Sequence, residues 1–166
     1  MGKRGAAGKM ADMIPASQKL IVIDTNVCLD LFVFEDPRWA PLLAALHAGE
    51  LRAVTRADCR EEYLFVLHYP HLPLDEATRP RAAERFDALI AVVAPDARAL
   101  RLPVCTDRDD QKFLEIARDA GAAVLITKDK ALLKLARRAA RENLFAIMTP
   151  EAWVKAQQAA QAAVAE

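Results

Sequence analysis

Short apolar runs alternate with longer amphipathic stretches between residues 20 and 150. Leu20–Ile23 is an unbroken, mostly β-branched run, which is typical of a strand buried on both faces. Ala123–Ile126 has the same character, and Arg52–Thr55 and Leu144–Met148 are weaker strand candidates. Strands that are apolar throughout and that alternate with helices predict an α/β domain with a parallel sheet.

The segments between these runs have the spacing of amphipathic helices. The expected helices cover Trp39–Ala48, Ala57 to the residues before Pro70, Arg81–Leu89, Asp107–Ala120 and Asp129–Arg141. Gly49 and Gly121 are expected to end two of them. Asp58 and Glu61 have the D-x-x-E spacing of a capping box, and the tail from Glu151 is expected to be helical at first and to fray later.

Length and composition fit one folded domain. The chain has 166 residues, of which 54% are hydrophobic and 28% charged, and this excludes a disordered chain. Residues 1–18 are small, polar and basic, so we expect a flexible leader there, a folded domain over residues 19–155 and a fraying tail over residues 156–166. No apolar run approaches the roughly 18 residues of a membrane span, and no secretory signal is visible. With three scattered cysteines, we expect a cytoplasmic protein without membrane contact.

Charge and motif content exclude several classes of function. Lys and Arg total 23 and Asp and Glu total 23, so nucleic acid would have to bind through a local patch. The chain has no Gly-rich nucleotide-binding motif and no nucleophile elbow. His68 and His71 are interrupted by Pro70 and lack the cysteine pair of a zinc site, so we interpret them as part of a turn after a helix.

Acidic residues follow strands or begin helices at four places. Asp24 follows the first strand and Asp129 a later one, while Glu62 and Asp110 lie near the starts of expected helices. The carboxyl ends of parallel strands meet at one sheet edge, so we expect these acids to gather there. A carboxylate beside a buried strand is costly unless it is paired or binds a metal, and hard oxygen ligands suit Mg²⁺ or Mn²⁺.

The same acids also have structural interpretations. Asp107 and Asp129 stand where N-caps are expected, and acids in a first helical turn are stabilising by about 0.3–1 kcal/mol each. Asp24 is the hardest to explain as a structural residue, and spacing places Asp110 and Glu62 on the inner sides of their helices. The residue pattern alone therefore leaves metal binding and helix capping equally open.

Four short motifs occur in a set order along the chain. They are D-T-N at Asp24, E-x-x-x-V-L at Glu62, D-x-D-D-x-x-x-L-x-x-A at Asp107 and T-x-D-x-x-L-L at Thr127. Together they resemble the PIN domain and, more narrowly, the PIN-family toxins of bacterial toxin–antitoxin systems. The resemblance covers residues 20–150. It implies a three-layer α/β/α fold with a five-stranded parallel sheet and a Mg²⁺- or Mn²⁺-dependent endoribonuclease.

The resemblance also implies a role for each motif residue. The acids implied to be catalytic and to hold the metal are Asp24, Glu62, Asp110 and Asp129. Asp107 is implied as an additional or alternative ligand, and Asn26 and Thr127 as residues that support the acids by hydrogen bonds. Three cations beside the acids are candidate nucleic-acid contacts, with ordinary solvated charge as the alternative: Arg108, Lys128 and Lys130.

The implied partners are an RNA substrate, a cognate antitoxin protein and a second copy of the chain. Two other functions stay open. One is a non-catalytic PIN-like module that binds RNA or protein, against which the complete set of acids argues. The other is a metal-dependent phosphatase or a DNA flap-type nuclease, for which the chain looks short.

Overall fold

A computed structural model describes residues 19–165 of the chain, and the expected leader lies outside the described residues. Five parallel strands form one sheet in the order β3-β2-β1-β4-β5. The strands are β1 (Lys19–Ile23), β2 (Leu51–Thr55), β3 (Ile90–Val92), β4 (Val124–Ile126) and β5 (Ala146–Met148). The expected α/β fold with a five-stranded parallel sheet is confirmed.

The chain starts in the middle of the sheet, at β1. It extends to one edge through β2 and β3 and then crosses to the other side for β4 and β5. Ile21 of β1 pairs with Ala53 of β2 and with Val124 of β4, so the three strands end at the same side of the sheet. Ligands of open α/β sheets bind where the strand order reverses, which here is the carboxyl end of β1 and β4.

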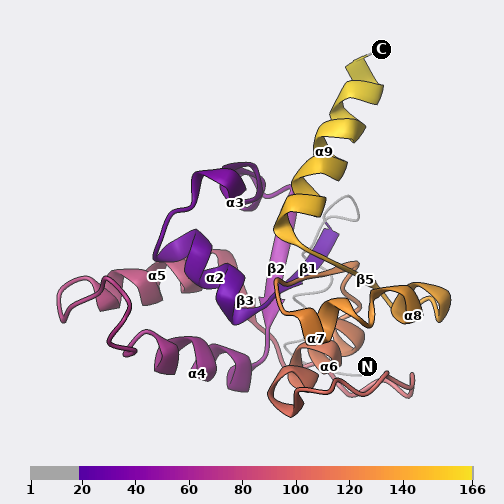
Figure 1. Cartoon of the computed structure of the whole chain (residues 1–166), viewed down its shortest axis with the longest axis horizontal. Coiled ribbons are helices and arrows are strands. Elements are labelled where there is room, and N and C mark those ends of the chain that lie inside the picture. Colours follow the sequence, from indigo (N-terminus) through magenta and orange to yellow (C-terminus); the bar gives the residue numbers. More distant parts are fainter. Residues whose placement is uncertain (1–18, 166) are drawn as a thin grey trace, which may run out of the picture.

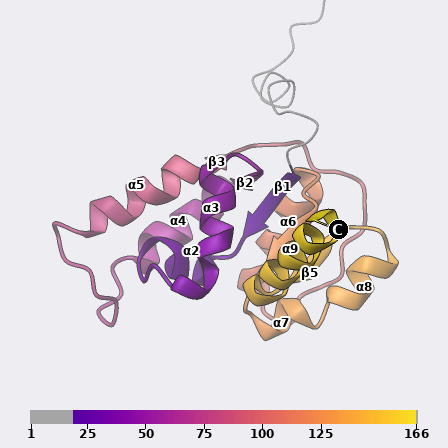
Figure 2. The same ribbon diagram turned by 90° about the horizontal axis from the view of Figure 1, so that it is seen from above.

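Helices cover both faces of the sheet (Figures 1 and 2). Buried side chains on one face come from α2 (Thr25–Phe32), α3 (Ala40–His47), α4 (Ala57–Val66), α5 (Arg79–Leu89) and α9 (Pro150–Ala165). Those on the other face come mainly from α6 (Gln111–Asp119), α7 (Lys130–Leu133) and α8 (Ala136–Arg141), with Cys59 of α4 added. Ile21 and Ile23 face the first group and Val22 the second, as the two-residue period of a strand requires.

Helix α2 is absent from the elements that the sequence pattern predicts. The run from Val27 to Phe32 is almost entirely apolar, and all of it is buried, so it carries no amphipathic signal. Asp24 is the N-cap of this helix and accepts a hydrogen bond from the backbone N–H of Val27 at 3.0 Å. Asp24 therefore has a structural role that the sequence pattern did not indicate.

Two other local predictions are wrong. Helix α4 begins at Ala57 as expected, but Asp58 does not cap it, because its carboxylate pairs with Arg56 at 2.8 Å. The single helix expected over Asp129–Arg141 is two helices, because the backbone tightens between α7 and α8, where the N–H of Leu135 bonds the carbonyl of Leu132.

Residues 19–165 also contain two short 3₁₀ helices, η1 (Pro37–Trp39) and η2 (Arg108–Asp110). Helix α9 runs without a break through residue 156, and its end projects from the body of the molecule in Figure 1. The domain boundaries and the fraying of the tail stay predictions. Among the described helices, none is both long enough and apolar enough to cross a bilayer.

Candidate metal centre

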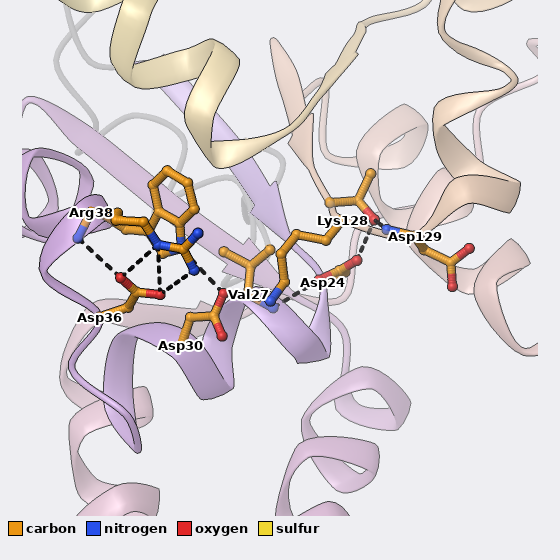
Figure 3. Close-up of polar contacts among 9 residues, drawn as sticks. Asp24, Val27, Asp30, Asp36, Arg38, Lys128 and Asp129 are labelled. Atoms are coloured by element: carbon orange, nitrogen blue, oxygen red, sulfur yellow. Dashed lines mark hydrogen bonds and ion pairs between the residues drawn. The ribbon is translucent and has the colours of Figure 1, made fainter.

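The site is built on the ends of two neighbouring strands. Asp24 follows β1 and Thr127 follows β4, and the Thr127 hydroxyl donates a hydrogen bond to Oδ2 of Asp24. The other oxygen of Asp24 accepts the Val27 N–H bond that caps α2. Both carboxylate oxygens of Asp24 therefore accept hydrogen bonds from the protein's own donors (Figure 3). Asp24 is 4% exposed and Thr127 is fully buried.

Burial dominates the acid–base behaviour of Asp24. It raises the pKa of Asp24 to about 6, against the lowering effect of the hydrogen bonds from Thr127 and Val27. The nearby charge of Asp129 also raises this pKa. An acid with such a pKa holds a proton in mildly acidic solution, and a cation that binds its carboxylate displaces this proton into the solvent.

Thr127 links Asp24 to Asp129. The backbone N–H of Asp129 donates to Oγ1 of Thr127 at 3.0 Å, while the hydroxyl donates to Asp24. Asp129 is the N-cap of α7, and its Oδ1 accepts from the N–H of Ala131 at 2.8 Å. One buried hydroxyl therefore fixes the relative positions of two acids that are far apart in the sequence.

Glu62 reaches the same edge from α4. Its Oε2 accepts a hydrogen bond from the Thr25 hydroxyl at the start of α2, and its Oε1 accepts from Nζ of Lys112 at 2.9 Å. Burial lowers the pKa of Lys112, but the hydrogen bond and charge of Glu62 outweigh burial and raise it. Lys112 therefore stays charged and paired with Glu62.

Asp107 and Asp110 come from the turn that precedes α6. Asp107 caps η2 by accepting from the N–H of Asp109 at 3.0 Å, and it is exposed. Single carboxylate oxygens of Asp107, Asp110 and Asp129 lie within 4.8 Å of one another. Asp24 and Glu62 are not members of this trio, although they line the same pocket.

Asp110 has the least satisfied carboxylate of the site. Its Oδ2 is buried and accepts no hydrogen bond from the described residues. Burial raises the pKa of Asp110 well above its ordinary range, and the hydrogen bond and charge of Asp129 raise it further. A buried carboxylate oxygen without a partner, beside two other carboxylates, is unfavourable unless a proton or a cation compensates it.

The acids surround one open pocket of about 310 Å³. Its acidic lining consists of Asp24, Glu62, Asp107, Asp109, Asp110 and Asp129. The donor set contains carboxylate oxygens and no cysteine, which fits Mg²⁺ or Mn²⁺ and not a thiolate-bound metal. The partnerless oxygen of Asp110 supports the same conclusion, so the residues present fit a divalent cation held by Asp107, Asp110 and Asp129.

The other residues implied by the resemblance differ in their exposure and in their hydrogen-bond and ion-pair partners. Asn26 is exposed and lines the pocket, but it makes no hydrogen bond to the acids within the described residues. Arg108 and Lys130 are exposed, and no carboxylate among residues 19–165 pairs with them. Lys128 is paired, because its Nζ lies 2.6 Å from Oδ2 of Asp30 (Figure 3).

Reasoning from the sequence missed Asp30 and Lys112, and it assigned no role to Thr25, although Thr25 belongs to the D-T-N motif. Asp30 is 8% exposed and also accepts from the indole N–H of Trp39 at 3.2 Å. Because Asp30 is an acid inside an otherwise apolar run, its position could have been noticed in the sequence. The contacts of Thr25 and Lys112 with Glu62 were not visible in the sequence, because only the packing of α4 against α2 and α6 brings Glu62 to them.

Comparison with known families gives one match. Residues 20–131, more than half of the chain, match the PIN domain. No curated protein sequence matches the chain. The match includes all five acids that the sequence motifs single out, and these acids line the pocket.

Proposed function

Because the chain belongs to the PIN domain family, whose members are generally metal-dependent nucleases, we propose that it is a Mg²⁺- or Mn²⁺-dependent endoribonuclease. The observation that carries this proposal is the group of acids at the sheet edge. Carboxylates from four separate segments line one pocket, and one buried oxygen there has no hydrogen-bond partner. A helix-capping function alone does not require such a concentration of negative charge.

The protein's own residues would divide the work of the site. The cation would be held by Asp107, Asp110 and Asp129. Asp24, which the Thr127 hydroxyl holds by a hydrogen bond, would add a further carboxylate to the pocket lining. A bound divalent cation would supply activation of water and stabilisation of charge on the phosphate and the leaving oxygen. Without a cation the carboxylates repel a phosphodiester, so substrate binding and metal binding are expected to be coupled.

Glu62 would take a part that differs from that of the trio. Its two oxygens already accept from Thr25 and from Lys112, and the ammonium offsets its charge. A carboxylate held in this way is oriented before the substrate arrives. We therefore propose that Glu62 orients water and substrate at the pocket wall.

Exposed cations near the pocket would contact the RNA backbone. Arg108 precedes the acids of η2 and Lys130 follows Asp129, and both side chains are exposed. Contacts of this kind position a nucleic acid without reading its sequence. Lys128 would serve less directly, since its ammonium pairs with Asp30.

The proposal is tested by calorimetric titration of Mn²⁺ and Mg²⁺ and by cleavage of single-stranded RNA. Glu62→Gln and Asp110→Asn are compared with Glu61→Gln, which changes an exposed neighbour on the same helix outside the pocket. We expect Asp110→Asn to weaken metal binding, both pocket variants to lose cleavage, and Glu61→Gln to behave as wild type. Metal binding without cleavage of any RNA would favour a non-catalytic RNA- or protein-binding module instead.

The finer biological proposal is that the chain is the toxin of a toxin–antitoxin pair in the cytoplasm, with a cognate antitoxin and a homodimer as associated states. It rests on the motif resemblance alone. Induced expression in bacteria is expected to arrest growth, and Asp110→Asn is expected to relieve the arrest. Normal growth with active, soluble wild-type enzyme would reject the toxin role and leave the nuclease proposal in place.

A further inference from the structure

Three exposed aromatic rings form a continuous surface beside the acidic pocket. Tyr69 and His71 line the pocket itself, and Phe65 extends the surface away from it. The ring centroids of Phe65 and Tyr69 are 5.8 Å apart, as are those of Tyr69 and His71. Phe65 is 68% exposed and Tyr69 is 39% exposed, which is unusual for rings of this size.

The aromatic surface begins on the side of α4 that carries Glu62. Phe65 and Val66 follow Glu62 at intervals of three and four residues, which places them on the same side of the helix. Tyr69 lies in the turn after the helix and lines the pocket together with Glu62 and Val66. The turn continues past the helix end, because the N–H of Tyr69 bonds the carbonyl of Val66 at 2.9 Å. The rings therefore extend from a pocket acid along α4 toward its carboxyl end.

The turn that carries these rings is anchored on both sides. Leu67 and Leu72 are buried in the core, and the N–H of Leu72 bonds the carbonyl of Tyr69 at 3.2 Å. Pro70 restricts the backbone between Tyr69 and His71. The rings are thus held outward by an ordered turn, so little conformational entropy is lost when a flat ligand stacks on them.

We infer that Phe65, Tyr69 and His71 form a stacking surface for an unpaired base of single-stranded RNA, which rests on the proposed ribonuclease function. Exposed aromatic rings bind splayed bases by stacking, and they do so with little preference for sequence. A base on Tyr69 leaves the adjoining phosphate at the acidic pocket that Tyr69 itself lines. The surface would therefore favour a single-stranded region over a duplex, whose bases are already stacked.

The position of the rings favours a nucleotide over a protein partner. Two of the three aromatic residues line the pocket that also contains Asp24, Glu62 and Asp110. A protein segment on these rings would face the cluster of carboxylates that lines the pocket. A nucleotide instead presents an apolar ring face to the aromatics and a phosphate to the cation that the carboxylates hold.

The first test measures binding of a fluorescein-labelled oligouridylate by anisotropy at low salt with Ca²⁺ in place of Mg²⁺, so that a cation with the same preference for oxygen ligands offsets the carboxylates. Gel analysis after each titration checks that the oligomer is intact. Tyr69→Ala is expected to weaken binding about tenfold, and Tyr69→Phe, which keeps the ring, to stay within about twofold of wild type. Phe34→Ala is the matched control, because Phe34 is 50% exposed but does not line the pocket. It is expected to leave binding unchanged.

A second arm removes the bases from the ligand. An abasic ribose-phosphate oligomer of the same length is expected to bind wild type about as weakly as oligouridylate binds Tyr69→Ala. Equal binding of the two oligomers by wild type, no measurable binding of either, or full affinity in Tyr69→Ala would overturn the inference. An intact thermal transition in Tyr69→Ala excludes unfolding as the cause of a loss.

Cleavage kinetics in Mg²⁺ separate this inference from the proposed function. For Phe65→Ala and Tyr69→Ala we expect KM to rise about tenfold with kcat little changed, because the rings touch the base and not the reacting phosphate. Wild-type KM in both variants of an active nuclease would reject the stacking surface alone. Base-dependent binding by a protein that cleaves no RNA would reject the nuclease alone.

Discussion

The two halves of the acidic pocket differ in how the protein satisfies their carboxylates. On the α2 side, Asp24 and Glu62 accept hydrogen bonds at both oxygens from neighbouring donors. On the η2 side, Asp110 and Asp129 approach each other and Asp107, and one buried oxygen of Asp110 has no partner among the described residues. The carboxylates of the first half have hydrogen-bond partners without any ligand. Those of the second half need a proton or a cation to offset their charge.

This difference indicates that the pocket has two kinds of wall. We call Asp24 and Glu62 the fixed wall, and Asp107, Asp110 and Asp129 the metal-dependent wall. Donors from α2, from Thr127 after β4 and from α6 hold the fixed wall in place before any ligand arrives. The metal-dependent wall concentrates negative charge, at a cost to the stability of the metal-free protein. Changes in the two walls should therefore have different effects, and the four predictions below run from the largest effect to the smallest.

The largest effect is expected from Asp110→Asn, which removes charge from the metal-dependent wall. Metal-dependent cleavage should fall by at least about a hundredfold, since even residues behind the ligands typically contribute 10–100-fold. The metal-free protein should become more stable, because a buried charge is replaced by a neutral amide. Calorimetric metal titration and thermal unfolding in EDTA measure the two effects, and lower stability in EDTA would contradict the comparison.

The second largest effect is expected from Thr127→Val, which changes the residue that holds Asp24 in the fixed wall. It removes the hydroxyl that donates to Asp24 and that accepts from the N–H of Asp129, so metal affinity or cleavage should fall about 10–100-fold. Stability should also fall, in contrast to Asp110→Asn, because two buried groups lose a partner. Thr127→Ser keeps the hydroxyl and should recover most of the activity, whereas equal loss in both variants would point to packing instead.

The pH dependence of the two walls sharpens the comparison. Asp24, with a pKa of about 6, and Asp110, whose pKa is also raised, bind protons in the folded protein at pH values where the unfolded chain has released them. Stability of the metal-free protein should therefore fall as the pH rises from about 4 through 7, and thermal unfolding in EDTA measures this. Metal affinity should rise over the same range, by up to about tenfold per pH unit, because the cation displaces the protons.

A pH-independent metal affinity between pH 5 and 7 would contradict this assignment. Asp24→Asn provides the matched control, because it removes one raised pKa while the α2 N-cap keeps a side-chain oxygen. Its stability curve in EDTA should be flatter than that of wild type.

The smallest effect is expected from a change at Asp30, which pairs with Lys128 beside the fixed wall. Asp30→Asn removes the charge that pairs with Lys128, the residue between Thr127 and Asp129, and should lower cleavage by about tenfold or less. Asp36→Asn is the control, because Asp36 pairs with Arg38 outside the pocket and should leave cleavage unchanged (Figure 3). Equal activity of Asp30→Asn and wild type would show that the Lys128 pair does not position the loop.

Much of the fold was predictable because it depends on local patterns. The β-branched runs at β1 and β4 gave a clear strand signal, and Gly49 and Gly121 adopt the positive φ values that end their helices. Helix α2 was missed because its run from Val27 to Phe32 is almost entirely apolar and buried on all sides, so it shows no amphipathic period. The break between α7 and α8 was missed because the residues there are good helix formers, and their packing against β5 is not visible in the sequence.

The sequence by itself determined the α/β class, the parallel sheet and the types of residue that gather at its carboxyl edge. These follow from residue identity and spacing, which act over a few neighbours along the chain. Only the tertiary structure decided that Asp24 and Glu62 are satisfied, that Asp110 is not, and that Lys128 pairs with Asp30. Hydrogen bonding and burial depend on atoms brought together from segments distant in sequence, so the charge state of each acid was fixed by folding.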